Sequence, residues 1–76
     1  MYELVGKFCM EFRKYILRMT LKEIAGDYSI SNVSSFEHGK ANKIDYLFLY
    51  YNACKNDSMK DEFIKGVFES GGQVSK

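Results

Sequence analysis

The chain has 76 residues, of which 46% are hydrophobic, and its formal net charge is +1. This length allows one domain with a compact core, and the near-neutral charge neither favours nor excludes nucleic acid, because the placement of charge decides that. Two cysteines are too few for the disulfide framework of a small secreted protein. No apolar run approaches the roughly 20 residues of a membrane helix, and the N-terminus lacks the pattern of a signal peptide. We therefore expect a cytoplasmic protein without a membrane segment.

Two helices are predicted in the first third of the chain. Apolar side chains recur at the three-and-four spacing of one helix face from residue 5 to residue 19, and we expect a helix over residues 2–18. This face consists of Val5, Phe8, Cys9, Phe12, Ile16 and Met19. Thr20 and Glu23 then stand in the Ser/Thr-x-x-Glu relation of a capping box, so a second helix begins there. It is short, because Gly26 and Asp27 weaken it at once.

The stretch SNVSSFEHG, residues 31–39, predicts a third helix of about two turns. Ser31 suits its N-cap, and Val33 and Phe36 lie three apart on the face that we expect to be buried. Gly39 lies where a helix C-terminus favours a residue tolerant of positive φ. The side chains left facing outward are Asn32, Ser34, Ser35 and His38.

Two further helices are predicted in the rest of the chain. Asn42 can cap the fourth, which is apolar on nearly every side and is therefore either central to the fold or half of an interface. Its first apolar stripe is Ile44, Leu47, Phe48, Tyr51 and Cys54; much of the rest is Tyr46, Leu49, Tyr50 and Ala53. Ser58 with Asp61 begins the fifth, whose apolar residues are Met59, Phe63, Ile64, Val67 and Phe68. Residues 1–70 then form a single domain, and residues 71–76 a flexible tail.

The segment MTLKEIAGDYSISNVSSFEHGK, residues 19–40, resembles the helix-turn-helix of the Cro and phage-repressor (XRE-type) family. That family's pattern is a helix that opens on Thr or Ser and contains a Leu/Ile-Ala pair, a turn, and a second helix ending in Ile/Phe-Glu-x-Gly. These places are filled by Thr20, Ile24, Ala25, Ile30, Ser31, Val33, Phe36, Glu37, His38 and Gly39. The resemblance extends over residues 7–54. It implies an all-α, compact five-helix lambda-repressor-like domain with the helix-turn-helix at residues 20–39.

On this resemblance, the second helix of the motif enters the major groove of DNA and its first residues meet base edges. The candidate readers are Ser31, Asn32 and Ser35, with Ser34 beside them. Asn can bond adenine through two hydrogen bonds, whereas Ser donates or accepts with little preference. The alternative is that these are ordinary cap and surface residues.

Basic and polar residues around this helix are candidates for contacts with DNA phosphates. They are Lys22, His38, Lys40, Asn42 and Lys43. Exposed lysines are also ordinary solubilising residues. Residues 1–43 hold seven basic and five acidic side chains, a small excess for a monomer, because affinity rests on the number of phosphate contacts. A symmetric homodimer would double those contacts.

The dimer or partner interface is expected on the last two helices. Its candidates are Tyr46, Leu49, Tyr50 and Phe68. The alternative is that the fifth helix simply covers the fourth within one monomer.

The sequence predicts no enzyme, cofactor or metal site. We interpret Glu37 as structural, either pairing with a basic residue of the first helix or bonding nearby amides. His38 has no Cys, Asp or Glu partner at metal-ligand spacing. Cys9 and Cys54 lack a C-x-x-C arrangement and are expected to behave as small hydrophobes, with a single disulfide between them left open. No Gly-rich phosphate loop or nucleophile motif is present.

The resemblance implies a sequence-specific DNA-binding transcriptional regulator, a small phage or mobile-element repressor that acts by operator occupancy on double-stranded DNA. Activation through polymerase contact is the other route. The alternative function is a protein-interaction module on the same fold, which binds a host regulator or a polymerase subunit. Four features favour it: the low basic charge, the apolar fourth helix, the segment between Ala25 and Glu37, which is shorter than the family's pattern, and Leu21, where the family often has Gln.

Overall fold

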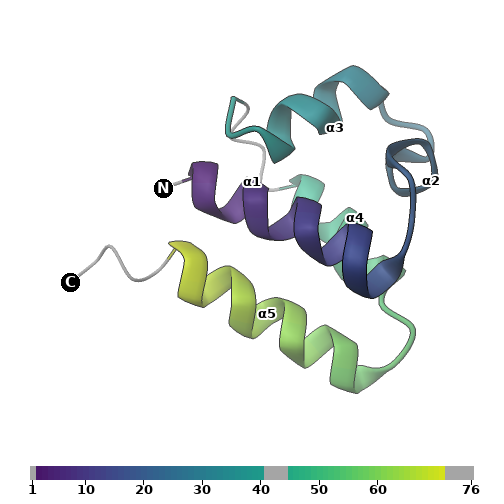
Figure 1. Cartoon of the computed structure of the whole chain (residues 1–76). Coiled ribbons are helices and arrows are strands. Elements are labelled where there is room, and N and C mark those ends of the chain that lie inside the picture. Colours follow the sequence, from purple (N-terminus) through teal and green to yellow (C-terminus); the bar gives the residue numbers. More distant parts are fainter. Residues whose placement is uncertain (1, 41–44, 72–76) are drawn as a thin grey trace.

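The computed structural model describes residues 2–40 and 45–71, and all regular structure in these ranges is helical. The elements are α1 (Tyr2–Glu11), continued by a π-helix η1 (Phe12–Leu17), α2 (Leu21–Ala25), α3 (Ile30–Glu37), α4 (Asp45–Ala53) and α5 (Asp57–Gly71). α1 lies at the centre, with α3 and α5 on opposite sides of it and α4 behind (Figure 1). The prediction of a compact all-helical domain with five helices is confirmed. None of the described helices has the length and apolar character needed to cross a membrane.

The first helix changes its winding partway along. α1 passes directly into η1, which ends at Arg18 in the left-handed conformation (φ 56°). A π-helix closes its hydrogen bonds five residues apart instead of four. After Phe12, the next apolar residue in the core is therefore Leu17, while Ile16 is 45% exposed. The prediction that Ile16 belongs to the buried face is wrong for this reason.

Side chains cap the helices that follow. Thr20 and Glu23 form the predicted capping box: the Thr20 hydroxyl accepts from the Glu23 amide at 3.1 Å, and the Glu23 carboxylate accepts from the Thr20 amide at 2.8 Å. α3 begins earlier than predicted, because the side chain of Ser29, not Ser31, caps it by accepting from the Asn32 amide at 3.4 Å. Gly39 has the predicted positive φ, 78°.

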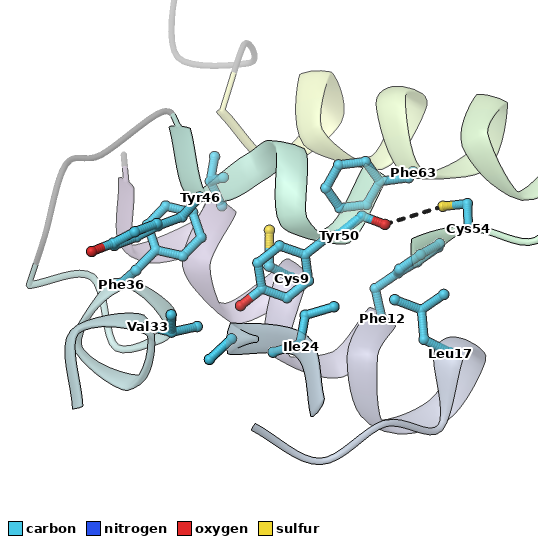
Figure 2. Close-up of a cluster of buried hydrophobic side chains, with 12 residues drawn as sticks. Cys9, Phe12, Leu17, Ile24, Val33, Phe36, Tyr46, Tyr50, Cys54 and Phe63 are labelled. Atoms are coloured by element: carbon cyan, nitrogen blue, oxygen red, sulfur yellow. Dashed lines mark hydrogen bonds between the residues drawn. The ribbon is translucent and has the colours of Figure 1, made fainter. Parts of the chain in front are cut away.

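The core gathers side chains from every helix (Figure 2). α4 enters it through Tyr46 and Tyr50, and Cys54, directly after the helix, continues this spacing of four residues. Tyr50 is fully buried and stacks on Phe63 of α5, with ring centroids 6.1 Å apart. In the predicted first stripe of this helix, Phe48 is 59% exposed, and Ile44 lies outside the described residues.

α5 also begins slightly earlier than predicted. The Asn56 side chain, not that of Ser58, accepts from the Met59 amide at 2.9 Å and so caps the helix. Phe63 is buried against the core, whereas Phe68 is 69% exposed. Of the residues predicted elsewhere in the chain, Asn42, Lys43 and the tail beyond residue 71 lie outside the described ranges.

Candidate nucleic-acid interface

α3 presents a polar surface to solvent. Ser31 and Asn32, in its first turn, are exposed, whereas Ser34 and Ser35 are half-buried. His38 is exposed at the end of the helix, where its Nδ1 lies 2.7 Å from the Ser34 carbonyl oxygen. Since a carbonyl oxygen only accepts, Nδ1 donates there and Nε2 points outward. Of the four predicted base readers, Ser31 and Asn32 are thus the accessible pair.

A buried ion pair fixes α3 from inside. Arg13 Nε donates to Glu37 Oε2 at 2.8 Å and Nη2 donates to Oε1 at 3.0 Å, so the pairing is bidentate. The Tyr50 hydroxyl donates to Glu37 Oε2 at 2.7 Å. Of the two readings of Glu37, the structural pairing with the first helix is confirmed. The last residue of α3 is thereby tied both to η1 and to α4.

The electrostatics of this network favour its present charge state. The hydrogen bonds that Arg13 donates to Glu37 raise the pKa of Arg13, which stays charged. Burial and the hydrogen bond to Glu37 raise the pKa of Tyr50, so its phenol keeps its proton and remains a donor. No described buried side-chain nitrogen or oxygen atom lacks a hydrogen-bond partner. The network therefore holds α3 against η1 and α4.

Sequence reasoning missed an apolar residue on the same surface. Ile30 is the first residue of α3 and is 45% exposed. Apolar side chains at such a position can contact the methyl group of thymine. The sequence feature that indicates this position is Ser29, which is also a good N-cap residue. With Ser29 as the N-cap, Ile30 is the first residue of the helix and faces outward.

The candidate phosphate contacts are partly accessible. Lys22 on α2 and Lys40 after α3 are exposed. Between described residues the only ion pair is that of Arg13 with Glu37, so neither lysine is held by a carboxylate there. Asn42 and Lys43 lie outside the described residues.

The predicted interface residues do not lie on one surface. Tyr46 and Tyr50 are 6% and 0% exposed inside the monomer, so the prediction that they form an interface is wrong. Tyr50 is drawn inward by its hydrogen bond to Glu37, and Tyr46 packs edge-on against Phe36 with ring centroids 5.6 Å apart. Leu49 is half-buried and Phe68 is exposed.

An apolar groove runs between α4 and α5. It has a volume of ≈ 410 Å³. Its lining residues are Leu47, Phe48, Tyr51, Phe63, Ile64, Val67 and Phe68. Phe68 is thus the one predicted interface residue that belongs to this groove.

Both cysteines are buried free thiols. Cys9 and Cys54 are buried and are not bonded to each other. Burial raises the pKa of both thiols, which disfavours the reactive thiolate. Within the described residues, no group of three or more His, Cys, Asp or Glu side chains can hold a metal ion.

Comparison of the chain with protein-family models, curated proteins and solved structures found no match. The surface of α3 and the groove between α4 and α5 are therefore the features from which a function is proposed.

Proposed function

We propose that this chain is a sequence-specific DNA-binding regulator of transcription, built as a lambda-repressor-like helix-turn-helix domain in which α3 enters the major groove. One observation carries the proposal: the first turn of α3 exposes short, uncharged polar side chains while its last residue, Glu37, is fixed in a buried network. Occupying a promoter would suffice for repression, in the manner of a small phage or mobile-element repressor.

The chemistry of the exposed turn suits base recognition. Asn32 can make two hydrogen bonds to adenine, Ser31 can donate or accept, and Ile30 can contact a thymine methyl. Since α3 is fixed by Arg13 and Tyr50, little conformational entropy is lost when these side chains meet a base. Ser34, Ser35 and His38 extend this surface, and Lys22 and Lys40 supply phosphate contacts beside it.

A homodimer would use the groove between α4 and α5. Phe48 and Phe68 are 59% and 69% exposed at its edges, and exposed apolar patches of this kind commonly mark interaction sites. Two copies related by a two-fold axis would bury these rings against each other and present two α3 helices to paired half-sites.

The same groove favours a second candidate function, a protein-interaction module. Residues 45–71 hold five acidic and three basic side chains, so two copies meeting here bring together surfaces of like charge. An amphipathic helix with basic residues beside its apolar face would complement the groove better. A host regulator or a polymerase subunit would be bound in this way.

The main test is recovery of DNA from sheared genomic fragments at near-physiological salt, followed by sequencing. Wild-type protein should enrich a few sites, and Ser31→Ala with Asn32→Ala should lose about 1–3 kcal/mol per base contact. Asn52→Ala with Ser58→Ala, an exposed Asn and Ser on α4 and α5, is the matched control and should bind as wild type does. If the folded wild-type protein enriches no site, the DNA-binding proposal fails.

The groove is tested by sedimentation of the full chain at increasing concentration. A homodimer should dissociate when Phe48→Asp and Phe68→Asp place charge in the groove, while thermal stability changes little because both rings are exposed. A wild-type chain that stays monomeric at every concentration would contradict the homodimer and favour the protein-interaction module.

A further inference from the structure

A hollow of ≈ 570 Å³ lies at the corner between η1 and α2. Its lining residues are Arg13, Lys14, Tyr15, Arg18, Met19, Thr20 and Leu21, and none of them is acidic. Lys14 and Arg18 are exposed, and neither forms an ion pair with any described residue. The hollow is therefore open and carries two cationic side chains whose charge is not met by a carboxylate there.

The base of this hollow is rigid. Arg13, whose own charge is met by Glu37, donates from Nη1 to the Met19 carbonyl oxygen at 2.9 Å. The Met19 amide in turn donates to the Arg13 carbonyl oxygen at 3.0 Å. The corner is thus held by the same side chain that fixes the last residue of α3, so the hollow and α3 keep a constant relative position.

Arg18 occupies a backbone conformation that suits glycine better. Its φ of 56° and ψ of 47° are left-handed, and it is the one described residue other than glycine with a positive φ. It also ends a π-helix, an arrangement found frequently at functional sites. Strained backbone of this kind tends to persist where the side chain serves a purpose, which points to the guanidinium of Arg18.

We propose that this hollow binds a phosphate group through Lys14 and Arg18, with the Tyr15 and Thr20 hydroxyls as further donors. Guanidinium groups bind phosphate oxygens through paired hydrogen bonds, and ammonium groups bind them as point charges. The hydroxyl of Tyr15, which is 72% exposed, is accessible to such a ligand.

The phosphate belongs to the backbone of duplex DNA, an assignment that rests on the proposed function. A site for a small ligand usually encloses most of it, whereas this hollow is open to solvent and suits one group on a large surface. Lys22, the residue after the lining residue Leu21, is a third exposed cation next to the lining in the sequence. We infer that a phosphate in the hollow adds to the contacts proposed for Lys22.

The test compares two double variants with the same change in charge. Lys14→Gln with Arg18→Gln removes the site, and Lys7→Gln with Lys65→Gln removes two exposed cations of α1 and α5 that do not line the hollow. Affinity for a short duplex is measured from about 50 to 200 mM salt. The site variant should show a slope of log K against log salt shallower by about 2, and the control variant should keep the wild-type slope.

Different results identify which proposal fails. If wild type and site variant bind duplex with equal slopes, the hollow does not hold a phosphate of DNA, although α3 still binds the duplex. If folded wild type binds no duplex, the DNA assignment falls together with the proposed function. In that case, inorganic phosphate is added while the amide NMR shifts of residues 14–21 are followed. Shifts that saturate in wild type but not in the site variant support a free phosphate ligand. Unchanged spectra overturn the phosphate site. The same measurements are made on Arg18→Gly, which should fold at least as well as wild type because glycine tolerates the left-handed conformation. This variant should lose the phosphate contact of Arg18, and unchanged binding would contradict the role of that side chain.

Discussion

Glu37→Gln should remove a large part of the stability of the protein, although it changes one heavy atom. The carboxylate accepts two hydrogen bonds from Arg13 and one from Tyr50, and Arg13 and Glu37 are 6% and 2% exposed. A glutamine amide removes the counter-charge, and its NH2 group, which only donates, replaces one of the two oxygens that accept from Arg13. Leaving a buried charge without its partner costs about 3–5 kcal/mol, and a domain of this size has roughly 4–11 kcal/mol of stability in total.

Urea unfolding followed by circular dichroism measures this loss directly. Glu62→Gln, the same change at an exposed position of α5, is the matched control and should alter stability by no more than about 0.5 kcal/mol. If Glu37→Gln loses less than about 1 kcal/mol relative to this control, then the carboxylate is solvated or unpaired and does not fix α3.

A triple replacement separates the cost of an unpaired charge from the net contribution of the network. Arg13→Met, Glu37→Met and Tyr50→Phe together remove every charge and hydroxyl of the network while keeping apolar volume. Since buried ion pairs often contribute little relative to apolar residues of similar size, the triple variant should recover most of the stability lost in Glu37→Gln. A triple variant no more stable than Glu37→Gln would mean that the network itself stabilises the fold.

Three further predictions follow from the core and the strained corner. Burial raises the pKa of Cys9 above its ordinary 9.0, and burial with the hydrogen bond to Glu37 raises that of Tyr50 above 10.0. Since the unfolded chain loses these protons first, stability should be full below about pH 9. It should then fall by about 1.4 kcal/mol per pH unit for Cys9 above about pH 9, and by the same amount again for Tyr50 above about pH 10. Urea midpoints in Tyr50→Phe should fall less steeply above about pH 10. Gly6→Ala should cost about 1–3 kcal/mol, because its Cβ would meet the carbonyl oxygens of Phe36 and Glu37 where α1 crosses the end of α3; an unchanged melting temperature would refute that close approach. Arg18→Gly should raise stability by about 0.5–1 kcal/mol, and a loss instead would show that the left-handed conformation is not strained.

Much of the fold was predictable where the signal is local. The capping box of Thr20 and Glu23, the positive φ of Gly39 and the burial of Val33 and Phe36 each depend on residues within one or two turns of the chain. Helix number and order follow from such signals because this chain contains no proline to interrupt its helices.

The rest depends on contacts between distant residues. α4 is apolar nearly all round, so its periodicity does not identify one buried face. The buried face is the one that contains Tyr50, whose hydroxyl donates to Glu37, 13 residues away. The π-helix has no sequence signature either. It places Arg13 where its guanidinium reaches Glu37, 24 residues along the chain, and the same shift of register exposes Ile16. The same holds for the candidate site. Ser31 and Asn32 are predictable from local sequence, whereas the hollow beside Arg18 depends on the π-helix.

On the proposed function, the number of exposed cations that meet DNA phosphates sets the affinity, and a dimer formed at the groove would double that number. One copy offers four exposed cations near α2 and α3, namely Lys14, Arg18, Lys22 and Lys40. At about 0.9 per phosphate contact, a monomer gives a slope of log K against log salt of about −3.6 and a dimer about −7. Between 50 and 200 mM salt, these slopes correspond to losses of affinity of roughly 10² and 10⁴. A wild-type slope near −7 that halves in Phe68→Asp would therefore show that the groove doubles the phosphate contacts, and a slope near −3.6 in both proteins would show that one copy binds alone and leaves the groove for another partner.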